Sequence, residues 1–288
     1  MSLSDTADLL AVQGDAEPAP SDLPNAEPPY TPHGTAAAFF DLDRTLISGS
    51  SAFVLGMTAY RNGLIPKAQF ARDAAAAVRF RLHGASDDTS TGVRDRILGA
   101  VRGVAVEDLV ALNADIVPKL MAKLRPEAKL LLDQHRHAHR ATYIVSASPV
   151  ELVEPLAKAL GMTGGLGTRS TIVDGIYTGE LAAPFCYGPG KVEAIRELAR
   201  WEGYHLDHCW AYSDSASDLP MMECVGHPVA VNPDGKLERI ANERGWPVVV
   251  FSRKSKSVVR RISQGVVTAG VAAGGFAAGA RYGRGRVS

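Results

Sequence analysis

The sequence has few cysteines and no signal for export. Its three cysteines, Cys186, Cys209 and Cys224, have neither the spacing of a metal site nor a paired spacing that indicates disulfides. The N-terminus lacks the basic start followed by an apolar run that is typical of a signal peptide. These absences favour a reducing, cytoplasmic location.

The sequence also lacks net charge, because 31 Lys and Arg balance 31 Asp and Glu. Residues 1–33 hold six acidic residues, six prolines and no Lys or Arg, which predicts a disordered acidic tail. Residues 253–288 hold eight basic residues and no acidic residue. The middle is nearly neutral and has no alternation of basic and aromatic residues, so we do not expect nucleic acid as a partner.

The most informative segment is FFDLDRTL at residues 39–46. The apolar run that ends at Phe40 predicts a buried strand of a parallel sheet. Asp41 and Asp43 follow it two residues apart. An extended backbone points both side chains the same way, at the edge of the sheet where open α/β folds bind ligands. Alone, such a pair could also cap a helix or shape a turn.

Three later segments place polar side chains at equivalent positions. In TYIVSASP, a predicted strand over residues 141–145 ends at Ser146. Lys191 opens a helical stretch in YGPGKVEAIREL. In CWAYSDSASDLPMM, a predicted strand over residues 209–213 is followed by Asp214 and Asp218.

In order and spacing, these four segments resemble the motifs of the haloacid dehalogenase-like hydrolases, within them the phosphoserine-phosphatase-like subfamily IB. The resemblance covers residues 34–250. It implies an α/β fold with a Rossmann-like parallel-sheet core over residues 34–48 and 125–252. A small helical cap, inserted after the first motif, would span residues 49–124 and cover the active site.

The resemblance assigns the reaction to three side chains. Asp41 would attack phosphorus to form an aspartyl-phosphate, and Asp43 would act as general acid and then as general base. Two neighbouring carboxylates tend to divide into one ionised and one protonatable group, which agrees with these roles. Lys191 would neutralise the charge of the transferring phosphoryl group.

The resemblance also implies a phosphate site and a Mg²⁺ site. Thr45, Ser146, Ala147 and Lys191 would contact the phosphoryl oxygens at a helix start. Mg²⁺ would be bound by the side chains of Asp41 and Asp214 and by the main-chain carbonyl of Asp43. Asp218 would orient Lys191 or the waters around the metal.

These roles predict a Mg²⁺-dependent phosphomonoesterase for a small or lipid-linked substrate. A phosphoserine phosphatase proper is also possible. In those enzymes a glutamate nine residues after the nucleophile binds the substrate amino group, whereas Ser50 occupies that position here. The same fold could also carry a phosphotransferase or a catalytically silent regulatory module.

Two further segments carry weaker signals. His135, His137 and His139 alternate along a predicted helix, so they would point around it, and we expect helix-surface residues rather than a metal site. Residues 262–280 are nineteen uncharged residues between arginines, rich in Gly and Ala. Residues 257–288 are therefore either a flexible extension or a weak membrane contact, with basic flanks attracted to anionic lipids.

Overall fold

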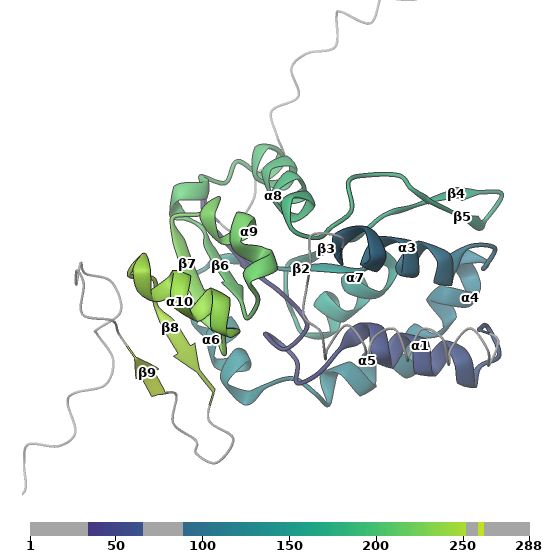
Figure 1. Cartoon of the computed structure of the whole chain (residues 1–288), viewed down its shortest axis with the longest axis horizontal. Coiled ribbons are helices and arrows are strands. Elements are labelled where there is room, and N and C mark those ends of the chain that lie inside the picture. Colours follow the sequence, from purple (N-terminus) through teal and green to yellow (C-terminus); the bar gives the residue numbers. More distant parts are fainter. Residues whose placement is uncertain (1–33, 66–88, 252–258, 262–288) are drawn as a thin grey trace, which may run out of the picture. The chain divides into compact units, whose positions relative to one another are not determined.

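The computed structural model describes residues 34–65, 89–251 and 259–261. The expectations for the tails at 1–33 and 262–288 lie outside these residues. One sheet of seven strands has the order β3-β2-β1-β6-β7-β8-β9, in which β9 alone is antiparallel to its neighbour (Figure 1). The strands are β1 (Ala37–Phe40), β2 (Ala141–Pro149), β3 (Gly164–Thr168), β6 (Trp210–Ser213), β7 (His227–Val231), β8 (Val248–Val250) and β9 (Val259–Arg261).

The central strand β1 is buried on both faces, as a parallel sheet covered by helices requires. Its four residues, AAFF, are at most 1% exposed. Alternate side chains enter different clusters: Ala38 and Phe40 join one, whereas Ala37 and Phe39 join the other. The predicted Rossmann-like parallel core is therefore confirmed.

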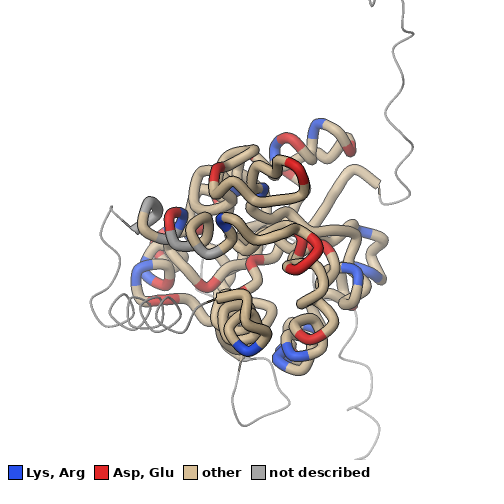
Figure 2. The backbone as a smooth tube through the Cα atoms, turned by 90° about the vertical axis from the view of Figure 1, so that its right-hand side faces the viewer, with Lys and Arg blue, Asp and Glu red and all other residues tan. Residues whose placement is uncertain are grey.

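Helices cover both faces of the sheet. Buried residues of α6 (Pro126–His137) and α7 (Val150–Ala159) pack in the cluster of Phe40. Those of α8 (Pro189–Glu202), α9 (Leu219–Glu223) and α10 (Gly235–Glu243) pack in the cluster of Phe39. In Figure 2, acidic and basic positions are interspersed along the described elements.

The predicted cap range contains α1 (Ser51–Arg61), α3 (Thr89–Val101), α4 (Val106–Ala111) and α5 (Asn113–Met121). A hairpin of β4 (Ser170–Val173) and β5 (Ile176–Leu181) joins them, although it comes from the later core range (Figure 1). Tyr177 of β5 is 1% exposed, and its main chain exchanges hydrogen bonds with Gly103 and Val104. Its packing against the helices of the predicted cap range was not predicted.

Two findings concern the C-terminal part. Residues 259–261 fall in the predicted basic tail, yet they pair with β8 as an edge strand. No helix within the described ranges is long and apolar enough to cross a membrane. The uncharged segment at 262–280 lies outside those ranges, so its membrane contact stays a prediction.

The prediction of surface positions is correct for His137 and His139 but wrong for His135. His135 is 2% exposed because it follows Ala128 and Leu132 on the helix face that packs on the sheet. Arg140 Nε donates to its Nδ1 at 2.9 Å, so its Nε2–H donates to Tyr212 Oη at 2.7 Å. Burial, helped by the charge of Arg140, lowers the pKa of His135 to about 3.

This buried neutral histidine predicts a loss of stability in acid. Below a pH of about 6.5, the usual pKa of histidine, His135 binds a proton in the unfolded chain but not in the folded protein. The free energy of unfolding therefore falls as pH drops. The slope from this residue is at most about 1.4 kcal/mol per pH unit. Urea unfolding between pH 7 and pH 4.5 should therefore show a shallower decline for His135→Gln than for the wild type.

The matched control is His137→Gln, since His137 is exposed on the same helix. It should keep the wild-type slope. If His135→Gln declined as steeply as the wild type, the buried histidine would not be the source of the pH dependence.

Candidate active site

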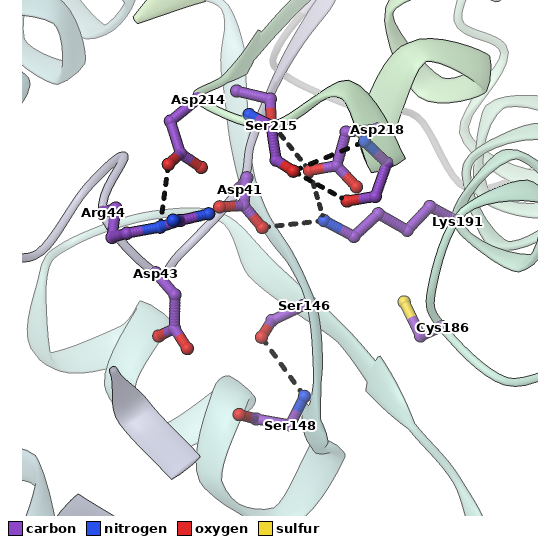
Figure 3. Close-up of polar contacts among 12 residues, drawn as sticks. Asp41, Asp43, Arg44, Ser146, Ser148, Cys186, Lys191, Asp214, Ser215 and Asp218 are labelled. Atoms are coloured by element: carbon purple, nitrogen blue, oxygen red, sulfur yellow. Dashed lines mark hydrogen bonds and ion pairs between the residues drawn. The ribbon is translucent and has the colours of Figure 1, made fainter. Parts of the chain in front are cut away.

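The four predicted motifs meet at one edge of the sheet, where the chain order reverses. β1 lies between β2 and β6, so their carboxyl ends are adjacent. Asp41 extends the pairing by one residue, because its N–H donates to the carbonyl of Tyr212 at 2.9 Å. Ser146 of β2 and Asp214 after β6 flank it (Figure 3). Such a switch point is the usual ligand position in open α/β sheets.

A buried ion-pair network connects three of the predicted residues. Lys191 Nζ lies 2.7 Å from Asp41 Oδ1 and 2.8 Å from Asp218 Oδ2, and the lysine is 2% exposed. Ser213 Oγ donates to the same Asp218 oxygen at 2.7 Å. Burial alone would lower the pKa of Lys191, but Asp218 and Asp41 outweigh it and raise that pKa. Lys191 is therefore a fixed ammonium ion.

Pro189 and Gly190, directly before Lys191, explain how the lysine reaches this position. Pro189 begins α8, which suits the first position of a helix. A Cβ atom at Gly190 would collide with the carbonyl oxygen of Phe185, so only glycine allows the preceding loop to close against the helix start. The loop thus anchors the first turn of α8, and with it Lys191, beside Asp41.

Asp41 and Asp214 carry more negative charge than their surroundings neutralise. Burial raises the pKa of Asp41 to about 7. The charge of Lys191 opposes this rise but does not cancel it, because the one ammonium ion is shared between Asp41 and Asp218. Burial also raises the pKa of Asp214 to about 7, against the opposing charge of Arg44. Arg44 Nε lies 2.8 Å from Asp214 Oδ2. The arrangement favours a further cation.

Asp43 lies in a different environment from Asp41. The main-chain N–H of Ser51, at the start of α1, donates to Asp43 Oδ1 at 2.7 Å. Burial raises the pKa of Asp43, and its hydrogen bonds to Ser51 oppose that rise. A carboxyl group that protonates more readily than an exposed one suits a proton donor. Its contact with α1 links this group to the predicted cap range.

Of the predicted phosphate ligands, Lys191 contacts Asp41 and Ser146 lies near it (Figure 3). Thr45 is 2% exposed, and its Oγ1 is buried without a hydrogen-bond partner among the described residues. Buried polar groups are normally hydrogen-bonded, so this hydroxyl is available to bind a ligand. Ser146 is 5% exposed and its Oγ accepts from the N–H of Ser148 at 3.2 Å. The carbonyl of Ala147 accepts from Thr168 Oγ1 at 2.7 Å, which fixes the backbone that carries its amide.

The oxygen donors fit the predicted Mg²⁺ site in kind. Within residues 34–65, 89–251 and 259–261, no three His, Cys, Asp or Glu side chains gather into a metal site. The predicted set instead uses two carboxylates, Asp41 and Asp214, with one main-chain carbonyl of Asp43. Mg²⁺ commonly takes one or two carboxylates and fills its remaining positions with water and phosphate. The metal stays a prediction.

Three residues that shape the site had no predicted role. Arg44 contacts Asp214, Ser51 binds Asp43, and Ser213 binds Asp218. The signal for Arg44 was a basic residue directly after the second aspartate of the motif. Ser51 is buried, and its Oγ also lies 2.8 Å from Ser148 Oγ, which connects α1 to the last residues of β2.

Several known proteins are similar to this chain in sequence or in fold. Residues 38–223 match the family model of the haloacid dehalogenase-like hydrolases. A probable phosphatase of Mycobacterium tuberculosis is 43% identical over 232 residues, which cover 78% of this chain and 80% of that protein. Phosphoserine phosphatase SerB1 of the same species is 40% identical over 252 residues, which cover 85% and 80%. A Bordetella pertussis protein of unknown function has a crystal structure with a TM-score of 0.65 and 26% identity, covering 74% of this chain and 97% of that one.

The buried network yields a prediction about stability. Lys191→Met removes the ammonium ion and leaves Asp41 and Asp218 buried without it, so unfolding at pH 8 should require about 3–5 kcal/mol less than in the wild type. The penalty should shrink as pH falls, because burial raises the pKa of Asp41 and loss of the opposing charge of Lys191 raises it further, so this carboxyl group takes up a proton in the folded variant. Urea unfolding at pH 8 and pH 5 measures both effects.

Lys129→Met is the matched control, because Lys129 is exposed and pairs with Asp133 on the same helix. Its cost should be under about 1 kcal/mol at both pH values. An equally small cost for Lys191→Met would contradict the importance of the buried network.

Proposed function

This chain belongs to the haloacid dehalogenase-like hydrolases as a phosphoric monoester hydrolase, and we propose that it cleaves a small phosphomonoester through a phosphorylated Asp41. The observation that carries this proposal is the buried Asp41 carboxylate, oriented through Oδ1 by Lys191 and followed two residues later by Asp43. A nucleophile and a separate proton donor at the end of one strand are what a two-step phosphoryl transfer requires.

In the first step, Asp41 Oδ2 attacks phosphorus in line with the ester oxygen. The bond from Asp41 to phosphorus forms while the bond to the ester oxygen breaks, and Asp43 gives its proton to the departing alkoxide. In the second step, water attacks phosphorus and gives a proton to Asp43, and the bond to Asp41 breaks. Inorganic phosphate and the free alcohol are the products, and both carboxyl groups return to their initial state.

The surrounding residues stabilise the charge on the phosphoryl group. Lys191 supplies a fixed positive charge, and Thr45 supplies a buried hydroxyl that has no other partner among the described residues. Ser146 and the amide of Ala147 add donors at the end of β2. Removing one such donor from a water-excluded site typically slows the reaction by roughly 10²–10³-fold.

Mg²⁺ would be held by Asp41, Asp214 and the Asp43 carbonyl, and it would supply positive charge to the phosphoryl oxygens. The raised pKa values of Asp41 and Asp214 support this assignment, because a divalent cation would keep both carboxylates ionised at neutral pH. The Mg²⁺ requirement is part of the proposal.

The second candidate is a phosphoserine phosphatase proper, which the similarity to SerB1 favours. Ser50 argues against it. Ser50 precedes α1, where its side chain accepts a hydrogen bond from the N–H of Phe53 at 3.3 Å as a helix cap. A neutral hydroxyl lacks the charge that would bind a substrate ammonium group.

Two further functions have less support. The predicted catalytic and binding residues from Asp41 to Asp218 are all present, which argues against a silent regulatory module. A phosphotransferase would pass the phosphoryl group from Asp41 to an alcohol instead of water. A lipid-linked substrate rests on residues 257–288, most of which lie outside the described part of the chain. We therefore favour a small, water-soluble phosphomonoester.

The acid role of Asp43 can be tested with two leaving groups. In Asp43→Asn, turnover of an alkyl phosphate should fall by roughly 10²–10⁴-fold, because the alkoxide must be protonated. The first burst of p-nitrophenol from p-nitrophenyl phosphate should survive, since this leaving group needs no proton. Stopped-flow kinetics measures the burst, and Asp41→Asn should show none.

Asp133→Asn, at an exposed aspartate on α6, is the control and should behave as the wild type. Equal losses of the burst and of alkyl turnover in Asp43→Asn would count against the acid role.

Substrate choice can be tested at Ser50. We expect the wild type to hydrolyse phosphoserine no better than glycerol phosphate, and Ser50→Glu to raise kcat/KM for phosphoserine and phosphoethanolamine about tenfold, as a charge-assisted hydrogen bond allows. Ser50→Gln provides the uncharged control. A strong wild-type preference for phosphoserine over both other esters would instead establish the second candidate.

A further inference from the structure

Arg44 occupies an unusual place in the first motif, between the aspartates and Thr45. Its backbone is left-handed, with φ of 63°, a conformation that non-glycine residues seldom adopt. Its N–H donates to the carbonyl of Gly49 at 3.2 Å, which closes the loop after β1. The loop therefore places the Arg44 side chain beside the carboxylates.

The guanidinium group of Arg44 lies where the cation of the proposed metal site would act. Its Nε is 2.8 Å from Asp214 Oδ2. In Figure 3 it lies between the side chains of Asp214 and Asp43 and extends toward Asp41. Asp41 and Asp214 are the two carboxylates assigned to Mg²⁺, so arginine and metal would share the same ligands.

The two basic side chains of the site differ in their freedom to move. The Lys191 side chain is 3% exposed and is held by Asp41 and Asp218, whereas the Arg44 side chain is 60% exposed. The Asp214 side chain is 6% exposed, so its buried carboxylate needs a positively charged partner even when no metal is bound. Among the described residues, its ion pair is with Arg44. Arg44 can leave for solvent without emptying a space in the core.

We infer that Arg44 is the counter-ion of Asp214 in the metal-free protein, and that it gives up this contact when Mg²⁺ binds. Arg44 thereby sets the Mg²⁺ affinity of the site, by competing for a carboxylate that the metal needs. A guanidinium ion has no lone pair to offer a metal, so it can only compete. The inference rests on the proposed Mg²⁺ site, but not on any particular substrate.

Calorimetric titration of the full chain with MgCl₂, without substrate, tests the competition. Arg44→Gln should bind Mg²⁺ about three- to fivefold more tightly than the wild type, the size expected for losing a half-exposed ion pair. Arg136→Gln removes an arginine that is similarly exposed but pairs with Asp133 on α6, and it should leave the Mg²⁺ affinity unchanged.

Thermal unfolding gives a second readout, because removing a purely structural arginine would lower the melting temperature equally with and without Mg²⁺. Without Mg²⁺, Arg44→Gln should melt below the wild type, because Asp214 loses its counter-ion. At saturating Mg²⁺ the gap should close, because Arg44 no longer holds Asp214 in the wild type either.

The outcomes separate this inference from the proposed function. If wild type and Arg44→Gln bind Mg²⁺ equally, or if the variant binds it more weakly, the competition is refuted while the metal site stands. A gap in melting temperature that is the same with and without Mg²⁺ also refutes it. If neither protein binds Mg²⁺, the proposed metal requirement fails, and the inference fails with it.

Discussion

Lys191 extends an ammonium group into a buried position between two carboxylates, and the site is arranged around this contact. The helix start at Pro189 and the glycine at 190 bring the lysine to the end of β1. Ser213, the last residue of β6, donates to Asp218 and fixes the second carboxylate. Because burying an unpaired charge costs several kcal/mol, each of these elements depends on the others. Asp41 is thereby held in one orientation before any substrate arrives.

The same contact leaves the site short of positive charge. One ammonium ion serves Asp41 and Asp218, and Asp214 is a third buried carboxylate at the same edge of the sheet. Arg44 compensates from an exposed position on the loop after β1. This charge balance agrees with the proposal that so acidic a site binds a phosphate dianion, because the carboxylates would attract the cations that the phosphate needs.

The strand ends were predictable because apolar runs followed by short polar segments identify buried strands and their carboxyl ends. That rule located Asp41 and Asp214, but it ended the strand before Ser146 too early, because β2 continues to Pro149. It did not apply to His135, which lies on a helix, where the signal was its spacing from the buried Ala128 and Leu132 on the same face. The packing of the hairpin at Tyr177 and the contact of Arg44 with Asp214 depend on segments far apart in the sequence. Periodicity and local propensity carry no such information.

Reductive trapping can show whether Asp41 becomes phosphorylated during turnover. The wild type would be mixed with a slowly hydrolysed phosphomonoester and quenched with borohydride, which converts an acyl phosphate to an alcohol. Peptide mass spectrometry should then find homoserine at position 41, dependent on substrate and Mg²⁺, and unmodified aspartate at 43 and 214. Homoserine at another position, or none during steady turnover, would show that Asp41 is not the nucleophile.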